Sequence, residues 1–265
     1  MHTAILIPAR YQSKRYPGKP LAELTGAHGT AKSLIRRSWE RARAVAGVDH
    51  VVVATDDDRI AEHCAGFGAV VAMTPADCAN GTERCAAAAG SLDTAPEVVV
   101  NFQGDAPLTP AHVVETLLQA MRDDPGIAVA TPVVRCDATM LAAFEGTRRQ
   151  GGIGETSAVF DRQGRALYFS KEILPTRRAD AAELATPVFQ HMGIYAYRTD
   201  ALTRYGDWPV GRLEAHEGLE QLRFLENGHR VQCCAVDLRG QPVHELNNPD
   251  DKPRIEAVLR DHGID

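Results

Sequence analysis

Short hydrophobic runs alternate with helical patterns through the first half of this chain of 265 residues. The apolar runs that predict strands are Thr3–Ile7, His50–Ala54, Ala69–Met73, Glu97–Phe102 and Ile127–Val134. The segments with apolar residues at helical spacing are Ser33–Ala46, Arg59–Gly66, Thr82–Ser91 and Pro110–Arg122. This alternation predicts an α/β fold of βαβ units, with a mainly parallel sheet and helices on both faces.

The second half of the chain has a different pattern. Two short strands, Ser157–Phe160 and Ala166–Phe169, flank the turn sequence Asp161–Gly164 and predict a hairpin. The other predicted elements are a strand over Gln190–Arg198, a helix over Leu213–Asn227, a strand over Val231–Val236 and a helix over Pro249–Arg260. Hairpin-paired strands in an α/β chain indicate an inserted hairpin or a dimerisation region. The stretch Glu145–Glu155 is rich in glycine and charged residues, and we expect no regular structure there. No linker divides the chain, so we expect one domain over residues 1–265.

Composition and charge exclude several classes of protein. Hydrophobic residues make up 44% and charged residues 24%, as in an ordinary globular protein, and no apolar run is long enough to span a membrane. The formal net charge of −6 argues against a nucleic-acid binder. The six cysteines are scattered and include no C-x-x-C pair, and the ten histidines form no H-E-x-x-H motif. With no charged segment of a secretory signal before the first strand, we expect a cytoplasmic protein.

The segment Pro8–Leu21 directly follows the first predicted strand and carries three separated cations. Arg10, Arg15 and Lys19 lie in a loop that is stiffened by prolines and contains one glycine. In parallel sheets, ligands bind outside the carboxyl ends of the strands, so a cationic loop at this place predicts a phosphate site. The segment is neither a Walker A motif nor G-x-G-x-x-G. The alternative, a solvated basic loop, explains the prolines less well.

Gln103, Gly104 and Asp105 follow the predicted strand Glu97–Phe102. A carboxylate in this position is suited to Mg²⁺, which takes one or two carboxylates together with substrate phosphates. The alternative is that Asp105 caps the helix that starts near Pro110, and the local sequence does not separate the two interpretations.

Asn80–Arg84 opens the predicted alanine-rich helix. One interpretation is a capping turn with Thr82 as the N-cap. The other is a nucleotide base held by backbone groups and Arg84.

The order of these motifs resembles a known family. The segments that carry the resemblance are Pro8–Leu21, Asn80–Arg84, Asn101–Leu108, Ala166–Pro175, His191–Arg198 and Leu213–Gly228. Together they resemble the CMP-KDO synthetases, the 3-deoxy-manno-octulosonate (KDO) cytidylyltransferases, almost from end to end. The resemblance implies a Rossmann-like nucleotidyltransferase fold, usually a homodimer. The implied reaction joins CTP and a sugar acid, with Mg²⁺, to give the CMP-sugar and diphosphate; more generally, we expect CTP and a small acidic acceptor as substrates.

The resemblance also implies roles for individual residues. The nucleotide-binding half would cover about residues 1–135, and the acceptor-binding and dimerisation half about 136–265. Catalytic roles fall to Lys19, Arg10 and Asp105. The implied CTP-binding residues are Pro8, Ala9, Arg10, Arg15, Lys19, Asn80, Gly81, Arg84 and Gln103. The implied acceptor-binding residues are Gln103, Lys171, His191, Tyr195, Glu220 and Gln221. Without the resemblance, the last four would be interpreted as core or helix-face residues.

The chain departs from the family pattern in its second half. Asn247 stands where the family usually has the second metal-binding aspartate, so the implied metal ligands are Asp105 and Asn247, with Glu245 as a rival. Gly154–Val159 lacks a lysine that is usual in the family, and Lys171 stands where an arginine is common. Arg177 and Arg178 follow in the same loop.

These departures bear on the acceptor. The additional basic residues favour a phosphonate acceptor such as phosphonoformate, and the first alternative is CMP-KDO synthesis for lipopolysaccharide. A second alternative is a non-catalytic nucleotide-binding module, for which Asn247 is the best argument.

Overall fold

The computed structural model describes residues 1–13, 15–152, 154–176 and 186–265, and the chain divides into two compact units. Unit 1 contains Met1–Glu115, Tyr197–Gly206 and Leu238–Asp265, and unit 2 contains Thr116–Ala196 and Asp207–Asp237. The division of roles between residues 1–135 and 136–265 stays a prediction.

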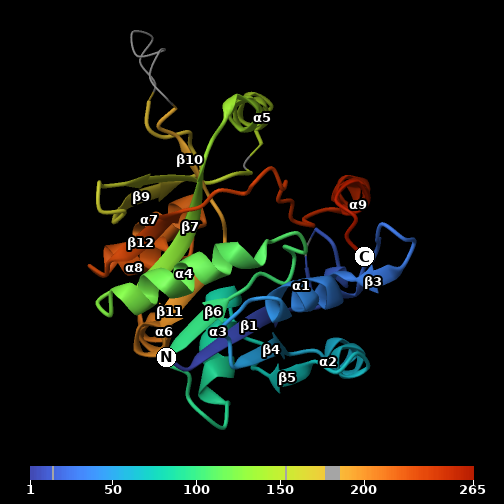
Figure 1. The fold of residues 1–265 in the computed structure, drawn as a ribbon. Coiled ribbons are helices and arrows are strands. Elements are labelled where there is room, and N and C mark those ends of the chain that lie inside the picture. Colours follow the sequence, from blue (N-terminus) through green and yellow to red (C-terminus); the bar gives the residue numbers. More distant parts are fainter. Residues whose placement is uncertain (14, 153, 177–185) are drawn as a thin grey trace. The chain divides into compact units, whose positions relative to one another are not determined.

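The centre of unit 1 is a parallel sheet in the order β5–β4–β1–β6 (Figure 1). Its strands are β1 (Thr3–Ala9), β4 (His50–Thr55), β5 (Val70–Met73) and β6 (Val98–Asn101). All four were predicted, with slightly different ends. Strand β1 runs on through Pro8 and Ala9 because both residues continue the parallel register with β4. The carboxyl ends of β1 and β6 therefore lie side by side, and each leads into one of the loops singled out in the sequence.

Helices flank this sheet, with α1 and α3 packed against β1 and α2 against β4 and β5. Their bounds are α1 (Leu34–Arg43), α2 (Asp58–Ala65) and α3 (Gly81–Gly90), and α9 (Lys252–Asp261) packs against β2 (Glu23–Thr25) in the same unit. Helix α4 (Ala111–Asp123) begins in unit 1 and continues into unit 2, and α6 (Thr199–Asp207) lies in unit 1 except for its last residue. Ser33 caps α1 as predicted, since its hydroxyl accepts a hydrogen bond from the N–H of Arg36. The prediction that Thr82 caps α3 was wrong. Asn80 is the N-cap, because its side chain accepts from the N–H of Glu83 at 2.8 Å.

A buried apolar cluster fixes the C-terminal segment of unit 1. Its members are Leu24, Leu34, Leu108, Leu246, Ile255 and Leu259. Leu108 follows Asp105 in the loop after β6, and Leu246 precedes Asn247, so the cluster brings these two loops together. The N–H of Leu246 donates to the carbonyl oxygen of Asp105 at 3.0 Å. Apolar packing therefore places Asn247 beside Asp105, although 142 positions separate 105 from 247 in the sequence.

Unit 2 is built on a mixed sheet around β7 (Val129–Arg135), which pairs in parallel with β12 (Val231–Ala235). On its other side, β10 (Phe189–His191) pairs antiparallel with both β7 and β8 (Ser157–Phe160). Strand β9 (Ala166–Ser170) completes the hairpin with β8, which confirms the predicted hairpin.

Two long elements predicted in the second half were wrong. The strand predicted over Gln190–Arg198 is divided into β10 and β11 (Tyr195–Arg198), because the chain turns at Met192–Ile194, where the N–H of Ile194 donates to the carbonyl of Met192. The helix predicted over Leu213–Asn227 is divided into α7 (Arg212–Glu217) and α8 (Leu222–Glu226). Gly218 ends α7 in the left-handed region, with φ 66°.

Some elements were not predicted at all. Helix α5 (Ala138–Arg149) takes up the start of the stretch Glu145–Glu155, for which no regular structure was expected, and Asp137 caps it. The hairpin of β2 (Glu23–Thr25) and β3 (Ala31–Ser33) is too short to show a periodic pattern, and α6 was also missed. Within the described ranges, single turns of 3-10 helix cover Lys19–Leu21 and Pro249–Asp251. Across the described residues, we find no helix with the length and apolar character that crossing a membrane requires.

Gly104 holds the loops after β1 and β6 in contact. A Cβ added to Gly104 would lie 2.8 Å from the carbonyl oxygen of Pro8, a backbone atom that cannot move aside. We therefore expect Gly104→Ala to lower the free energy of unfolding by about 1–3 kcal/mol. The control is Gly206→Ala in α6, where a Cβ would meet nothing within 4 Å. That change should be neutral or stabilise the protein by up to about 1 kcal/mol. Equal unfolding midpoints in denaturant for both variants would contradict this account.

Candidate functional site

The loops of unit 1 converge on Pro8, at the carboxyl end of β1. A Cβ on Gly104 would lie 2.8 Å from the carbonyl of Pro8, and a Cβ on Gly81 would lie 3.3 Å from its ring. The three motifs predicted to bind the nucleotide are thus brought together at one end of the parallel sheet. The absence of side chains at residues 81 and 104 allows this close approach.

Two contacts shape the cationic loop. The N–H of Gly18 donates to the carbonyl of Tyr11 at 2.9 Å and closes the loop, and the positive φ of Gly18, 71°, suits this turn. The guanidinium of Arg59 lies 3.3 Å from the centre of the Tyr11 ring, and its partner Asp57 caps α2. Helix α2 therefore supports the loop that carries Arg10 and Arg15.

Lys19 and Asp105 form the central contact of the site. The ammonium of Lys19 lies 2.6 Å from Oδ2 of Asp105, and the two side chains are 15% and 24% exposed. This ion pair joins the loop after β1 to the loop after β6. Arg10 is exposed, and no hydrogen bond or ion pair from the described part of the chain reaches its side chain. Arg10 and Lys19 thus supply positive charge at the same end of the sheet.

Asn247 lies next to this pair, as the packing of Leu246 requires. Its Oδ1 accepts from Nη2 of Arg15 at 3.1 Å, and its Nδ2 donates to Oε2 of Glu245 at 3.2 Å. Glu245 therefore orients the amide so that its oxygen faces the cationic loop. Asp105 and Asn247 together offer a carboxylate and an amide oxygen, the hard ligands that Mg²⁺ takes beside substrate phosphates. The described residues contain no cluster of three or more His, Cys, Asp or Glu that could hold a metal alone. The site fits a metal that is shared with a phosphate.

Arg84 and Asn80 are engaged in structural contacts. Arg84 is buried, lies 3.2 Å from Oδ1 of Asp56 and donates to the hydroxyl of Thr74 at 2.5 Å, so it ties α3 to the loops after β4 and β5. Asn80 uses its oxygen as the helix cap and its Nδ2 to donate to the hydroxyl of Tyr205 at 3.2 Å. Roles for these two residues in binding cytidine stay predictions.

Gln103 is half-buried, and its Nε2 donates to Oδ1 of Asn101 at 3.5 Å. Asn101 itself is fully buried, and its Nδ2 has no partner in the described structure. A side chain on Gly81 would approach that nitrogen to 3.7 Å. Asn101 was not assigned a role from the sequence. A polar amide at the end of a strand that otherwise consists of valines could have indicated a functional residue.

The acceptor residues predicted in unit 2 form a second cluster. His191 is buried, its ring lies 5.1 Å from the Phe169 ring and 5.5 Å from the Tyr195 ring, and the hydroxyl of Tyr195 donates to Oε1 of Gln221 at 2.9 Å. Burial and, to a smaller extent, the positive charge of Lys171 together lower the pKa of His191 from 6.5 to about 3. His191 is therefore neutral at physiological pH.

Lys171 and Glu220 lie on the segments around this cluster. The ammonium of Lys171 donates to the carbonyl of Gly154 at 2.8 Å, directly after β9. Glu220 is half-buried and lies in the connection between α7 and α8, rather than in the single amphipathic helix that was predicted. Arg177 and Arg178 lie outside the described residues.

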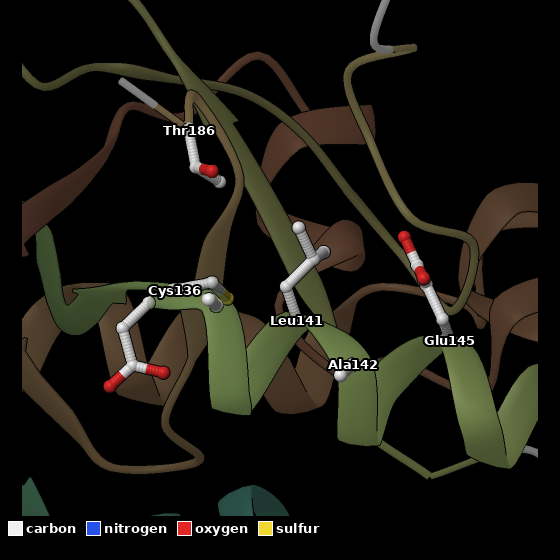
Figure 2. A pocket seen from close by; sticks show the side chains of 7 residues that line it. Cys136, Leu141, Ala142, Glu145 and Thr186 are labelled. Carbon is white, nitrogen blue, oxygen red and sulfur yellow. The ribbon is translucent and has the colours of Figure 1, made fainter. Parts of the chain in front are cut away.

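A cavity elsewhere in unit 2 holds none of the predicted site residues. It measures about 480 Å³ and is lined by Cys136, Asp137, Ala138, Leu141, Ala142, Glu145 and Thr186. Leu141, Ala142 and Glu145 come from helix α5, and Thr186 from a separate segment (Figure 2). We assign no ligand to it.

Comparison with known proteins identifies the family. The cytidylyltransferase family model matches residues 4–231. The chain is 39% identical to a 3-deoxy-manno-octulosonate cytidylyltransferase from Maricaulis maris over 99% of both chains. It is 40% identical to the corresponding protein of Chlamydia pneumoniae, over 96% of this chain and 92% of that protein.

Solved structures agree with this assignment. A structure of CMP:2-keto-3-deoxy-manno-octonic acid synthetase complexed with CTP matches with a TM-score of 0.85 and 35% identity, over 99% of this chain and 100% of the other. A 4-diphosphocytidyl-2C-methyl-D-erythritol synthase from Anaerococcus prevotii shares the fold, with a TM-score of 0.61 at 11% identity, over 98% of this chain and 96% of the other. The predicted α/β nucleotidyltransferase fold is confirmed. The chain belongs to the 3-deoxy-manno-octulosonate cytidylyltransferase family, and the protein is a nucleotidyltransferase.

Proposed function

We propose that the protein transfers CMP from CTP to KDO, with Mg²⁺, and releases diphosphate. The names of the full-length relatives support this acceptor over the phosphonate that the sequence departures favoured. The CTP complex of a relative at 35% identity supports CTP as the donor. The alternative of a non-catalytic nucleotide-binding module is less well supported. Both residues that were assigned catalytic charges, Lys19 and Asp105, are present and form an ion pair.

The observation that carries the acceptor assignment is the hydrogen-bonding character of the unit 2 cluster. The hydroxyl oxygen of Thr131 lies 2.8 Å from Nε2 of His191 and also 2.8 Å from the carbonyl oxygen of Ile194. A carbonyl can only accept, so Thr131 donates its single proton to Ile194 and accepts the proton on Nε2 of His191. The other ring nitrogen, Nδ1, is then a bare acceptor, and no hydrogen bond from the described residues reaches it.

Gln221 supplies the complementary donor. Its oxygen accepts from Tyr195, while its Nε2 is buried and has no partner in the described structure. A hydroxyl group can donate to Nδ1 of His191 and accept from Nε2 of Gln221. KDO carries several hydroxyls, whereas the oxygens of ionised phosphonoformate can only accept. His191 offers a neutral acceptor and Gln221 a neutral donor. This pair therefore favours KDO, whose hydroxyls can both donate and accept, over phosphonoformate.

The cations of unit 1 provide the chemistry on the CTP side. Arg10, Arg15 and Lys19 bind the triphosphate, and Lys19 stabilises the negative charge that grows on the leaving diphosphate as the acceptor oxygen attacks the α-phosphorus. Asp105 and Asn247 would hold Mg²⁺, which neutralises phosphate charge when bound. Asn247 is uncharged. The carboxylate of Glu245, which accepts a hydrogen bond from the Asn247 amide, supplies a negative charge next to it. No nucleophile from the enzyme is needed, because positioning accounts for most of the acceleration. A homodimer and a cytoplasmic location remain part of the proposal.

The neutral state of His191 predicts a pH dependence of stability. An unfolded histidine binds a proton near pH 6.5, while folded His191 does so only near pH 3. Below pH 6.5 the unfolded state takes up a proton that the folded state does not, so stability falls as pH falls, by about 1.4 kcal/mol per pH unit. Chemical denaturation at pH 7 and pH 5 should show a loss of stability that is smaller in His191→Gln than in wild type by about 2 kcal/mol; burial also lowers the pKa of His244, so part of the loss remains in the variant. The variant His216→Gln, at an exposed position, should keep the wild-type loss, and the same loss in His191→Gln would refute the assignment.

Release of diphosphate from CTP with a panel of acceptors tests the proposed function. With KDO, sialic acid and phosphonoformate compared at saturating CTP, we expect kcat/KM for KDO to exceed that for phosphonoformate by at least about 100-fold. Gln221→Leu removes the unpartnered donor and should raise KM for KDO about 10-fold or more. Faster turnover of phosphonoformate than of KDO would show that the acceptor is a phosphonate.

A further inference from the structure

Glu217 accepts hydrogen bonds from three residues at once in unit 2. Its Oε1 accepts from the hydroxyl of Ser170 at 2.8 Å and from the hydroxyl of Tyr168 at 3.2 Å, and its Oε2 accepts from the N–H of Lys171 at 2.7 Å. All three donors lie at the end of β9, where Lys171 leaves the strand. Neither the sequence pattern nor the family resemblance gave Glu217 a role.

From these contacts we propose that Glu217 is a positioning residue for the acceptor, one that holds Lys171 in a fixed place relative to Gln221. This inference rests on the proposed function, because Lys171 and Gln221 are assigned to the acceptor there. Glu217 is the last residue of α7, and Gly218 then turns the chain toward Glu220 and Gln221. One carboxylate therefore connects the strand that carries Lys171 to the turn that carries Gln221.

The chemistry of the three contacts explains why this residue is a carboxylate. A hydroxyl, a phenol and a backbone N–H all donate to it, and a carboxylate satisfies all three because both of its oxygens accept. An amide offers one acceptor oxygen and would turn its NH₂ toward either the hydroxyls or the N–H of Lys171. The phenol of Tyr168 responds to the charge: burial raises its pKa first, and the charge of Glu217 and the hydrogen bond to it raise the pKa further.

The packing of α7 and α8 does not depend on Glu217. Arg223 in α8 makes a paired hydrogen bond to both oxygens of Glu214 in α7, at 2.7 Å each, and both side chains are buried. Leu222 and Phe224 are fully buried beside them. These contacts hold the two helices together when Glu217 is replaced, so loss of its carboxylate should move Lys171 rather than unfold the unit.

Glu226 provides a matched control in the same helix pair. Its carboxylate also accepts two backbone hydrogen bonds, from the N–H groups of Leu213 at 2.9 Å and Glu214 at 3.1 Å. Those contacts lie at the opposite end of α7 from Glu217 and involve none of the acceptor residues. Glu226→Ala therefore removes a comparable carboxylate without touching Lys171.

Steady-state diphosphate release with KDO varied at saturating CTP tests the proposal. We expect Glu217→Ala to raise KM for KDO by about 10- to 100-fold, since one backbone and two hydroxyl hydrogen bonds to a charged group are lost. The kcat should stay within about 3-fold of wild type and KM for CTP within about 2-fold, because the contacts of unit 1 are unchanged. Glu217→Gln should recover most of the effect, to within about 5-fold of wild type, because an amide oxygen can still accept from the N–H of Lys171. Glu226→Ala should match wild type.

The outcomes separate this inference from the proposed function. A KM for KDO in Glu217→Ala within about 2-fold of wild type, or an equal rise in Glu226→Ala, would overturn the role of Glu217. If wild type uses phosphonoformate instead of KDO, the proposed acceptor fails, and the same comparison is made with phosphonoformate. As a readout independent of the acceptor, exchange of the Lys171 amide proton should be faster in Glu217→Ala than in Glu217→Gln. Equal exchange in the two variants would also overturn the role.

Discussion

The ion pair between Lys19 and Asp105 is the contact on which the rest of the candidate nucleotide site depends. It joins the loop that follows β1 to the loop that follows β6, and Gly104 permits the approach by leaving room for the carbonyl of Pro8. Each charge is partly buried and is balanced by the other, which limits the cost of desolvating either one. In the proposed function, Lys19 would contact the phosphates of CTP, and Asp105 would hold Mg²⁺, which would neutralise phosphate charge. The ion pair thus keeps the two groups close together, where the proposed function requires them.

The two units use different kinds of interaction for their proposed ligands. The loops of unit 1 present fixed positive charges, which suit a polyanion such as a triphosphate. In unit 2, the pair of His191 and Gln221 is neutral, because His191 is not protonated at physiological pH and Gln221 is an amide, while Lys171 supplies a positive charge beside the pair. The specificity of the pair lies in unpartnered donors and acceptors, which reject a ligand that cannot satisfy them. In the proposed function, charge selects the donor nucleotide, and hydrogen bonds from His191 and Gln221 contribute to the selection of the acceptor.

Local patterns in the sequence predicted the parallel sheet of unit 1 and the motifs at its carboxyl ends, since continuous valines and turn residues are determined over short distances. They failed where a single residue interrupts a longer pattern. Gly218 divides a helix whose apolar spacing continues through it, and the turn before Tyr195 divides an alternating strand. The role of Asn247 beside Asp105 was suggested by the family resemblance, and the position of Glu217 was not found, because both depend on contacts between distant segments. The preference for a phosphonate followed from counting basic residues without knowing the protonation of His191.

The most direct test of the account is turnover of CTP with KDO by Lys19→Met and Asp105→Asn, with Lys32→Met as control. Lys32 in β3 also forms a close ion pair, 2.9 Å from Glu40 in unit 1, and its ammonium donates to the backbone oxygen of Asp265, so these contacts do not include Asp105. The account predicts that each of the first two variants loses about 100- to 1000-fold in kcat while the control keeps wild-type turnover. Wild-type turnover in Lys19→Met and Asp105→Asn would mean that the ion pair is structural, and would contradict the account.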